Sequence, residues 1–432
     1  MHEVPIQAGN SSGPVWRQAI SGAQILFVAF GALVLVPLLT GLNPSMALLG
    51  AGVGTLLFQL VTKRQVPIFL GSSFAFIAPI IYATSHWGLP ATMGALACVS
   101  VMYFVFAGVI ARHGVEIVHK FMPPVVIGPI IMVIGLSLAG VAVNMAMGKA
   151  GTTIGYGPSL LLASVSLATT VIVSIFAHRF LKLIPILIGV GVGYILAAVL
   201  GYIDFSKVAA APWFAMPNFV APEFNISAIL FMLPVALAPA IEHVGNVIAV
   251  GGLTGKDYTA QPGLHRTLAG DGLGVLFAGM VGGPPITTYA EVTGALTLTR
   301  NFNPVIMTWA AVFAVAMAFV GKFNAVLQSI PTPVMGGIMI LLFGSIAAIG
   351  LKTLVSDRTD LEQPRNLVIV STVLVLGIGG FVVDINLQSV AQWLQSTLSL
   401  NIELGSFVLQ GVSLCGVVAI LLNLILPKIR KE

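Results

Sequence analysis

The sequence of 432 residues is 57% hydrophobic and only 8% charged, with a mean hydropathy of +1.03. Soluble globular chains carry about 25% charged residues, so this composition excludes a soluble domain and indicates an integral membrane protein. The net charge of +5 fits basic residues gathered on the cytoplasmic side of a membrane better than it fits nucleic-acid binding. Cys98 and Cys415 fall inside apolar runs, so we expect no disulfide framework, no metal site and no cofactor.

Apolar runs long enough to cross a bilayer, about 17–25 residues each, recur along the whole chain. They start near Ala19, Pro44, Gly88, Val125, Ser159, Leu183, Ile226, Leu264, Pro304, Pro333, Leu367 and Gly405. Two further segments, about 67–83 and 284–300, are apolar but interrupted, and we expect them to be discontinuous spans. The pattern predicts an all-α polytopic membrane protein with about fourteen transmembrane segments.

The basic residues orient these segments. With the N-terminus in the cytoplasm, 16 of the 19 basic residues fall on the cytoplasmic side, and only Lys149, Lys207 and Lys322 fall outside. Cytoplasmic loops of membrane proteins carry such an excess of Lys and Arg. We therefore predict that both termini are cytoplasmic.

A weak internal repeat divides the chain. The stretch PVVIG at 124–128 is echoed by PVMGG at 333–337, and each begins the second span after an interrupted one. We expect a first repeat over 1–200, an outer loop over 201–225 and a second repeat over 226–432. Because each repeat has seven spans, an odd number, the two are inverted. Transporters of this kind bind substrate near the bilayer midplane, where broken helices of both halves meet.

Two glutamates stand at membrane depth without a basic neighbour. Glu242 lies in the middle of the span that starts near Ile226, and Glu291 follows the broken start of 284–300. An unpaired ionised carboxylate is costly in hydrocarbon, and such residues usually face a cavity and mark a transport pathway. We predict that Glu242 and Glu291 bind substrate. The alternative for Glu242 is a protonated side chain bonded to a neighbouring helix.

Two carboxyls in one site also indicate proton coupling, because burial and a second carboxyl both favour the protonated form. Their substrate should offer N–H donors to the carboxyl oxygens. Carbonyl groups on the substrate would meet free backbone N–H groups where the interrupted span becomes helix. A planar heterocycle with alternating N–H and C=O groups meets both requirements.

Four other residues are weaker candidates for the binding site. Phe74 and Phe76 alternate with small residues, which predicts a short extended piece with aromatic rings on one side; two core phenylalanines are the alternative. His243 adjoins Glu242, and neighbouring side chains on a helix point about 100° apart. We expect His243 to make a polar contact between helices, with a role in proton coupling as the alternative. Asp271 follows Arg266 by five residues, and we interpret it as a helix-end charge paired with a basic neighbour.

At these residues the sequence resembles the nucleobase–ascorbate transporter family, and within it the bacterial uracil permeases. The stretches that carry the resemblance are VPIFLGSSFAFIAP (66–79), FMPPVVIGPIIMVIGL (121–136), AIEHVGN (240–246), PGLHR (262–266), GGPPITTYAEVTGALTLTR (282–300) and PTPVMGG (331–337). The resemblance implies fourteen spans in a seven-plus-seven inverted repeat, a core and a gate domain, and short strands in the third and tenth spans. It also implies an elevator-type movement, proton symport and a homodimer in the lipid membrane.

The resemblance assigns roles to single residues. Glu242 and Glu291 would hydrogen-bond the base, Phe74 would supply packing and a backbone contact, and Ala290, beside Tyr289, would supply a second backbone contact. A glutamate at 291 is similar to the uracil permeases. The function implied is proton-coupled import of uracil or a related pyrimidine.

This sequence also departs from the uracil permeases. Val292 stands where they usually have Asn, Asn246 where they often have His, Ile25 where they have His, and Ala290 where they have Gly. The alternatives that stay open are a xanthine or other purine permease of the same family and an anion transporter of the same fold. A membrane enzyme is disfavoured, because the polar residues contain no nucleophile–base pair.

Overall fold

The computed structural model describes residues 14–178, 181–182, 184–288, 292–294, 296, 301–386, 388 and 406–427, and it is mostly helical. The helices before the outer loop and within it are α1 (Val15–Thr40), α2 (Pro44–Val61), α3 (Ile77–His113), α4 (Glu116–Phe121), α5 (Pro124–Ser137), α6 (Ala139–Ala146), α7 (Tyr156–Phe176), α8 (Pro185–Val199) and α9 (Ser206–Ala210). The later helices are α10 (Ile226–Met232), α11 (Leu237–Thr254), α12 (Leu264–Val281), α14 (Pro304–Ala318), α15 (Gly321–Gln328), α16 (Thr332–Ser356), α17 (Pro364–Ile378) and α19 (Gly411–Ile425). The strands are β1 (Leu70–Ser72), β2 (Ile286–Thr288), β3 (Val382–Asn386) and β4 (Ser406–Gln410).

The helices have the length and composition of a multi-pass membrane protein. Among the described residues, seven helical stretches are long and apolar enough to cross a bilayer, and α8, α14, α17 and α19 are shorter apolar helices. α3 contains a break at Gly88, whose φ of 81° lies in the left-handed region that glycine adopts without strain. The chain therefore runs as two helical pieces on either side of Gly88.

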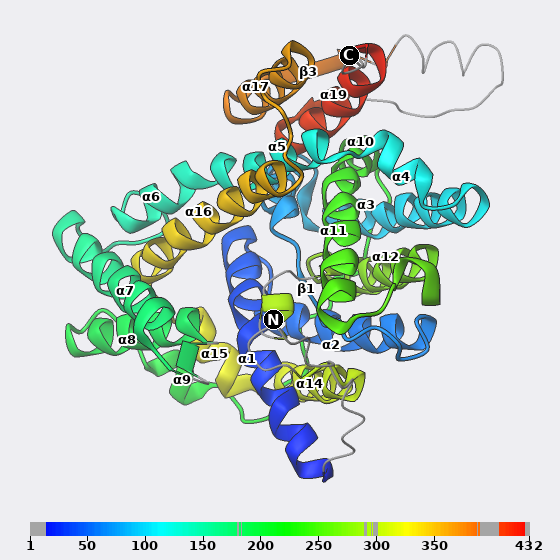
Figure 1. The fold of residues 1–432 in the computed structure, drawn as a ribbon. Helices are drawn as coiled ribbons and strands as arrows, with labels where there is room; N and C mark the ends of the chain where they lie inside the picture. The colour runs from blue at the N-terminus through cyan, green and yellow to red at the C-terminus, as the bar shows by residue number, and fades with distance from the viewer. Residues whose placement is uncertain are drawn as a thin grey trace.

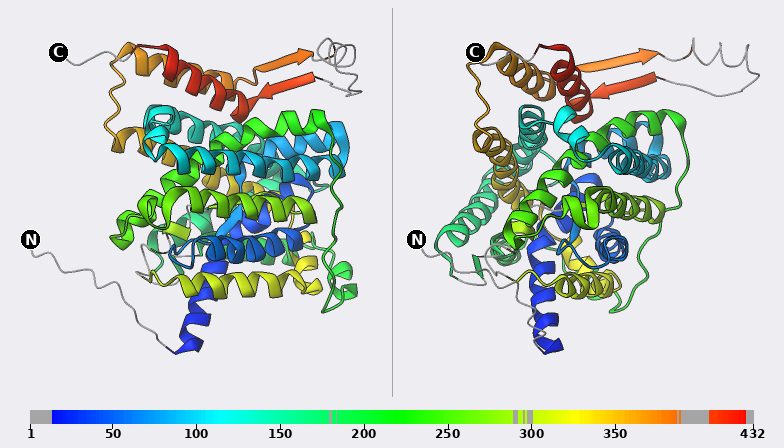
Figure 2. Two further views of the ribbon diagram at one scale, coloured as in Figure 1. Left: turned by 90° about the vertical axis from the view of Figure 1, so that its right-hand side faces the viewer. Right: turned by 45° about the vertical axis from the view of Figure 1, so that its right-hand side comes forward.

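The helices pack in two groups (Figure 1). In the first group, α12 and α2 pack against each other, α3 packs on α12, and α14 and α1 complete it. In the second, α16 packs against α5, α6 and α7, and α8 covers α7. α11 contacts both α12 of the first group and α5 of the second. Figure 2 shows α17, α19 and the β3–β4 pair together at one end of the molecule.

Two strands that are distant in the sequence meet inside the first group. β1 and β2 pair antiparallel, with Leu70 opposite Thr288 and Ser72 opposite Ile286. Beneath them α2 and α12 approach closely at Gly54 and Gly274, where a Cβ atom on Gly54 would lie 3.2 Å from the Gly274 Cα. Larger residues here would push the two helices apart. The glycines thus let both helices support the strand pair from one side.

Candidate substrate-binding site

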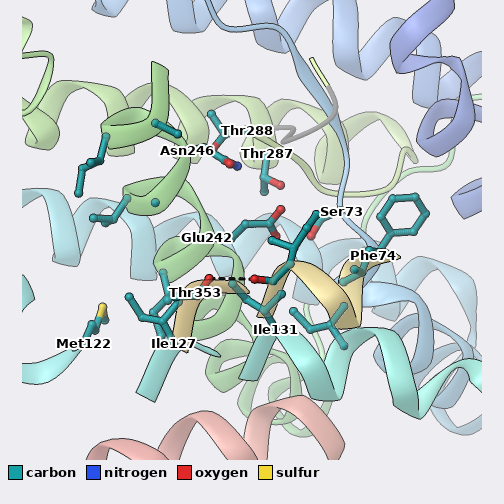
Figure 3. Close-up of a pocket in the computed structure, with 18 of the residues that line it drawn as sticks. Ser73, Phe74, Met122, Ile127, Ile131, Glu242, Asn246, Thr287, Thr288 and Thr353 are labelled. Carbon is teal, nitrogen blue, oxygen red and sulfur yellow. Dashed lines mark hydrogen bonds between the residues drawn. The ribbon is translucent and has the colours of Figure 1, made fainter. Parts of the chain in front are cut away.

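A cavity of about 360 Å³ opens where the strand pair, α11, α5 and α16 meet (Figure 3). Its polar lining comes mainly from the strand pair, the residue that follows β1, and α11, with Thr353 of α16 in addition. Its apolar lining is rich in isoleucine. The lining residues are Ser72, Ser73, Phe74, Met122, Pro124, Ile127, Ile131, Ile134, Ile241, Glu242, Val244, Gly245, Asn246, Ile248, Ala249, Thr287, Thr288, Ile346, Ile349 and Thr353.

The strands are held in place by bonds to their surroundings. A two-stranded ribbon is marginally stable by itself, but the Leu70 N–H donates to Thr55 Oγ1 of α2 over 2.9 Å. The Ser73 N–H donates to the Pro285 carbonyl over 3.0 Å, which extends the pairing by one bond beyond β1. These bonds fix the point where the chain leaves β1 and turns into α3. Phe74, in the short helical turn that leads into α3, therefore borders the cavity.

Glu242 projects from α11 into the cavity. Its side chain is half-buried, and Figure 3 shows it between Thr287 of β2 and Ser73 at the end of β1. Asn246 follows one helical turn later on the same face of α11, is only 9% exposed, and lines the same cavity. The two side chains give α11 a carboxylate acceptor and an amide group next to each other.

Three residues that line the cavity each carry a polar atom with no hydrogen-bond partner among the described residues. These atoms are the hydroxyl oxygens of Ser72 and Ser73 and the amide nitrogen of Asn246, and all three are buried. Buried polar groups in folded proteins are nearly always hydrogen-bonded. Unpaired donors grouped around one cavity indicate that a ligand supplies their partners.

Phe74 lines the cavity, but the predicted extended aromatic segment is wrong. Phe74–Phe76 is a single 3₁₀ turn between β1 and α3, with the Phe76 N–H bonded to the Ser73 carbonyl over 3.4 Å. The first turn of a helix often tightens in this way, and it rotates the two rings apart. The Phe74 ring packs edge-on against Phe343 at 6.3 Å, whereas Phe76 is fully buried in the core.

His243 makes the polar contact between helices that its place on α11 predicts. Its Nδ1 lies 2.9 Å from Asp271 Oδ2 and 2.7 Å from Thr288 Oγ1, and its Nε2 lies 2.8 Å from Thr267 Oγ1. Asp271 Oδ2 also accepts from the Thr288 N–H over 3.0 Å and from the Thr288 hydroxyl over 2.9 Å. His243 and Asp271 are both 0% exposed. The network joins α11, α12 and the end of β2.

The interpretation of Asp271 as a helix-end charge paired with a basic neighbour is therefore wrong. Asp271 lies in the second turn of α12, fully buried, and its ion-pair partner is His243. Residues five apart on a helix are about 140° apart around the axis, so Arg266 and Asp271 point to different sides. Spacing along the chain could not reveal the partner, because His243 lies 28 residues away.

Three predicted site residues, Tyr289, Ala290 and Glu291, lie outside the described residues, which end at Thr288 and resume at Val292. The polar cavity-lining residues that were not predicted from the sequence are Ser72, Ser73, Asn246, Thr287, Thr288 and Thr353. A helical-face argument would have found Asn246, since it lies four residues after Glu242. Ser72 and Ser73 lie in the interrupted segment 67–83. The interruption of this apolar segment is the sequence feature that points to them.

Comparison with known proteins places the chain in a family. A family model described as the permease family matches residues 17–385. The chain is 53% identical over 416 residues to the probable uracil permease of Haemophilus influenzae, covering 96% of each chain. It is 46% identical over 417 residues to the uracil permease of Bacillus caldolyticus, covering 94% of this chain and 90% of that protein. The chain belongs to this permease family, the nucleobase–ascorbate transporters, and is a transporter rather than an enzyme.

A solved structure shares the fold. The transmembrane domain of the cyanobacterial bicarbonate transporter BicA matches with a TM-score of 0.66 at 16% identity, covering 84% of this chain and 95% of that one. At such low identity the likeness concerns the arrangement of the helices and not the ligand.

Proposed function

We propose that this chain is a proton-coupled symporter that imports uracil or a closely related pyrimidine. The observation that carries the proposal is the cavity in which the Glu242 carboxylate stands beside three unpaired buried groups, on Ser72, Ser73 and Asn246. Uracil alternates N–H and C=O groups around one ring. Its N–H groups would donate to Glu242, and its carbonyls would accept from Asn246 Nδ2 and a serine hydroxyl. Relatives named uracil permease support this substrate.

The opposite side of the cavity suits the face of a planar ring. Ile127, Ile131 and Ile134 of α5 and Ile346 and Ile349 of α16 line it. Small-molecule sites are typically about 300–1,000 Å³, mostly apolar, with a few polar groups that fix the orientation. The cavity of about 360 Å³ lies at the small end of this range, which favours a single-ring base over a larger ligand.

Proton coupling is assigned to the carboxyls of Glu242 and Glu291. A carboxyl in a largely apolar cavity takes up a proton more readily than one in water. Protonation on one side of the membrane and release on the other would couple proton flow to the movement of the base. Glu291 is included on its sequence position alone, since it lies outside the described residues.

The wider architecture we propose has fourteen spans, as an inverted repeat of 1–200 and 226–432 joined by the outer loop 201–225. Both termini lie in the cytoplasm, the protein is a homodimer in the lipid of the inner membrane, and no nucleic acid is bound.

The group around α2 and α12, with the strand pair, forms the core domain, and the group around α5 and α16 forms the gate domain. The core moves against the gate in an elevator-type mechanism. Met122 and Thr353 line the cavity and lie within two residues of Lys120 and Lys352, which the predicted topology puts on the cytoplasmic side. We therefore infer that the cavity opens toward the cytoplasm.

A binding panel tests the substrate. Purified protein is heated with uracil, thymine, cytosine, xanthine and hypoxanthine, and the melting temperature is recorded for each. We expect uracil to raise it most, because a ligand that binds only the folded state stabilises it. Uptake of radiolabelled uracil, in a strain lacking other permeases, should be competed by unlabelled uracil and not by xanthine. Competition by xanthine at equal concentration would replace this proposal with a purine permease.

The fold likeness to a bicarbonate transporter raises the second candidate, an anion transporter. No Lys or Arg is among the described residues that line the cavity, and Glu242 gives it negative charge. A site for a bare anion needs the opposite polarity. Bicarbonate or chloride flux into liposomes that is insensitive to nucleobases would support this candidate instead.

A further inference from the structure

The buried hydrogen bonds around His243 suit a proton on each of its two ring nitrogens. The Thr267 hydroxyl has one hydrogen, and it donates this hydrogen to the Leu264 carbonyl over 3.0 Å. In this arrangement the hydroxyl oxygen presents a lone pair to His243 Nε2 at 2.8 Å, and Nε2 donates to it. The Thr288 hydroxyl likewise donates to Asp271 Oδ2 over 2.9 Å and presents a lone pair to His243 Nδ1 at 2.7 Å. Nδ1 also faces the acceptor Asp271 Oδ2 at 2.9 Å, so the same arrangement places a proton on Nδ1.

We infer that His243 is a buried imidazolium, paired with the carboxylate of Asp271, and that the pair positions the end of β2 beside the substrate cavity. Both partners are 0% exposed, and a charge at such depth is costly unless it is paired. Within the described part of the chain, no Lys or Arg lies within ion-pair distance of Asp271. The imidazolium supplies the counter-charge, so the pair as a whole is neutral.

The pair acts on the site through Thr288. Asp271 Oδ2 holds both the backbone N–H and the hydroxyl of Thr288, the last residue of β2, which itself lines the cavity. His243 shares α11 with Glu242, one residue away. One charged pair therefore sets the position of a cavity-lining strand relative to the helix that presents the carboxylate. His243 is a positioning residue and not a proton carrier, because both ring nitrogens are already protonated and already bonded.

The other titratable groups around the pair are few. Glu242 on α11 faces the cavity, and Tyr103 on α3 lies within the electrostatic influence of both Asp271 and Glu242. The second oxygen of Asp271, Oδ1, and the Tyr103 hydroxyl are buried and have no partner among the described residues. Neither group adds a positive charge, so Asp271 depends on His243 for neutralisation.

Nitrogen NMR of the full-length protein in lipid, with ¹⁵N-labelled histidine rings, measures the protonation state directly. At pH 8 solvent-exposed imidazoles, with pKa values of about 6.5, are neutral. We expect one histidine to show two protonated ring nitrogens at pH 8 without substrate, and His243→Gln to remove that signal, while His86→Gln at an exposed position leaves it. A His243 ring with one unprotonated nitrogen at pH 8 would overturn the inference.

Paired substitutions separate positioning from simple loss of structure. Asp271→Asn leaves the imidazolium without its counter-charge, so we expect the doubly protonated signal to disappear at pH 8. Each of His243→Gln and Asp271→Asn should weaken uracil binding by about tenfold, and the double variant, which buries no charge, should recover most of that loss. Additive losses in the double variant would contradict a charge pair. The effect on binding rests on the function proposed above, whereas the NMR result does not.

Discussion

The backbone N–H of Thr288 donates to Oδ2 of Asp271 over 3.0 Å, and both residues are buried. Thr288 ends β2 and Asp271 lies in the second turn of α12, so the bond ties the strand back to the helix that precedes it. Between them the chain turns at Gly282, where φ is 96° and α12 ends. A three-residue strand has too few ladder bonds to hold its own place. The side of the cavity formed by β2 therefore depends on Asp271.

Substitution of the cavity carboxylate should abolish accumulation of substrate. Glu242→Gln keeps the size of the side chain and removes the negative charge. Hydrogen bonds to a charged group are worth about 1.5–3 kcal/mol, so we expect the Kd for uracil to rise by at least about tenfold. Uptake driven by a pH gradient should be lost in liposomes. Glu223→Gln, in the exposed outer loop, is the matched control and should transport normally. Wild-type uptake by Glu242→Gln would remove Glu242 from the site.

Asn246→Leu should weaken binding without weakening the fold. The Asn246 amide nitrogen is buried without a partner among the described residues, so its loss costs the ligand-free protein nothing. Removing an unsatisfied buried group should raise the unfolding free energy by about 1 kcal/mol, whereas loss of its bond to the ligand should weaken binding about tenfold. Melting temperature and Kd measure the two effects separately. Asn218→Leu, on the exposed outer loop, should change neither. A lower melting temperature with unchanged Kd would assign Asn246 a structural role.

The packing of α12 on α3 predicts a stability effect away from the cavity. A Cβ atom on Gly279 would lie 2.5 Å from the backbone nitrogen of Ala97, so Gly279→Ala must move one helix. Such overpacking costs about 1–3 kcal/mol, and the melting temperature should fall. Gly344→Ala is the control, because a Cβ atom there meets nothing within 4 Å. Equal melting temperatures for the two variants would show that α3 and α12 are less tightly packed than described.

The turn between α11 and α12 predicts a pH dependence. The Thr259 hydroxyl and backbone N–H donate to Asp257 Oδ1 over 2.6 and 2.9 Å, and these bonds lower the pKa of the Asp257 carboxyl. Stabilisation by a lowered pKa is fully present above the unfolded-state pKa of about 3.9 and is lost as the pH falls through the folded-state value. Thr259→Val should therefore lower the melting temperature by a constant amount above about pH 5.

The same difference should shrink as the solution is acidified below pH 4. Thermal unfolding of both proteins between pH 3 and pH 7 measures it. A difference that grows toward acidic pH would show that the Thr259 hydroxyl stabilises the turn through another contact. Thr353→Val serves as a control, because the Thr353 hydroxyl bonds a helix carbonyl and no carboxylate.

Sequence patterns predicted the class of protein and the region of the site, because both depend on local features. The long apolar runs indicate a membrane protein, and the family model and relatives confirm the family. The carboxylate in an otherwise apolar run directed attention to Glu242, which lines the cavity. Its role in binding stays a prediction, as do the roles of Tyr289, Ala290 and Glu291 and the fourteen-span inverted repeat.

Other features depended on contacts between distant residues. Phe74 and Phe76 alternate as in a strand, but the start of α3 takes them into a helical turn. Asp271 has a basic residue five positions before it, yet the fold gives it His243 as a partner. The unpaired state of Ser72 and Asn246 is a property of the assembled cavity. No local pattern encodes any of these.

The isoleucine wall of α5 and α16 offers the ligand no hydrogen bond. Most of the described polar groups that line the cavity belong to the strand region and α11. Thr353, the one described hydroxyl on the opposite side, donates its hydrogen to the Ile349 carbonyl. If α11 and the first group of helices slide together past the second group, the ligand keeps these polar contacts and exchanges only apolar ones. Movement along such an apolar surface breaks no hydrogen bond to the ligand. The free-energy barrier to the movement is then set by side-chain packing and by the entry of water.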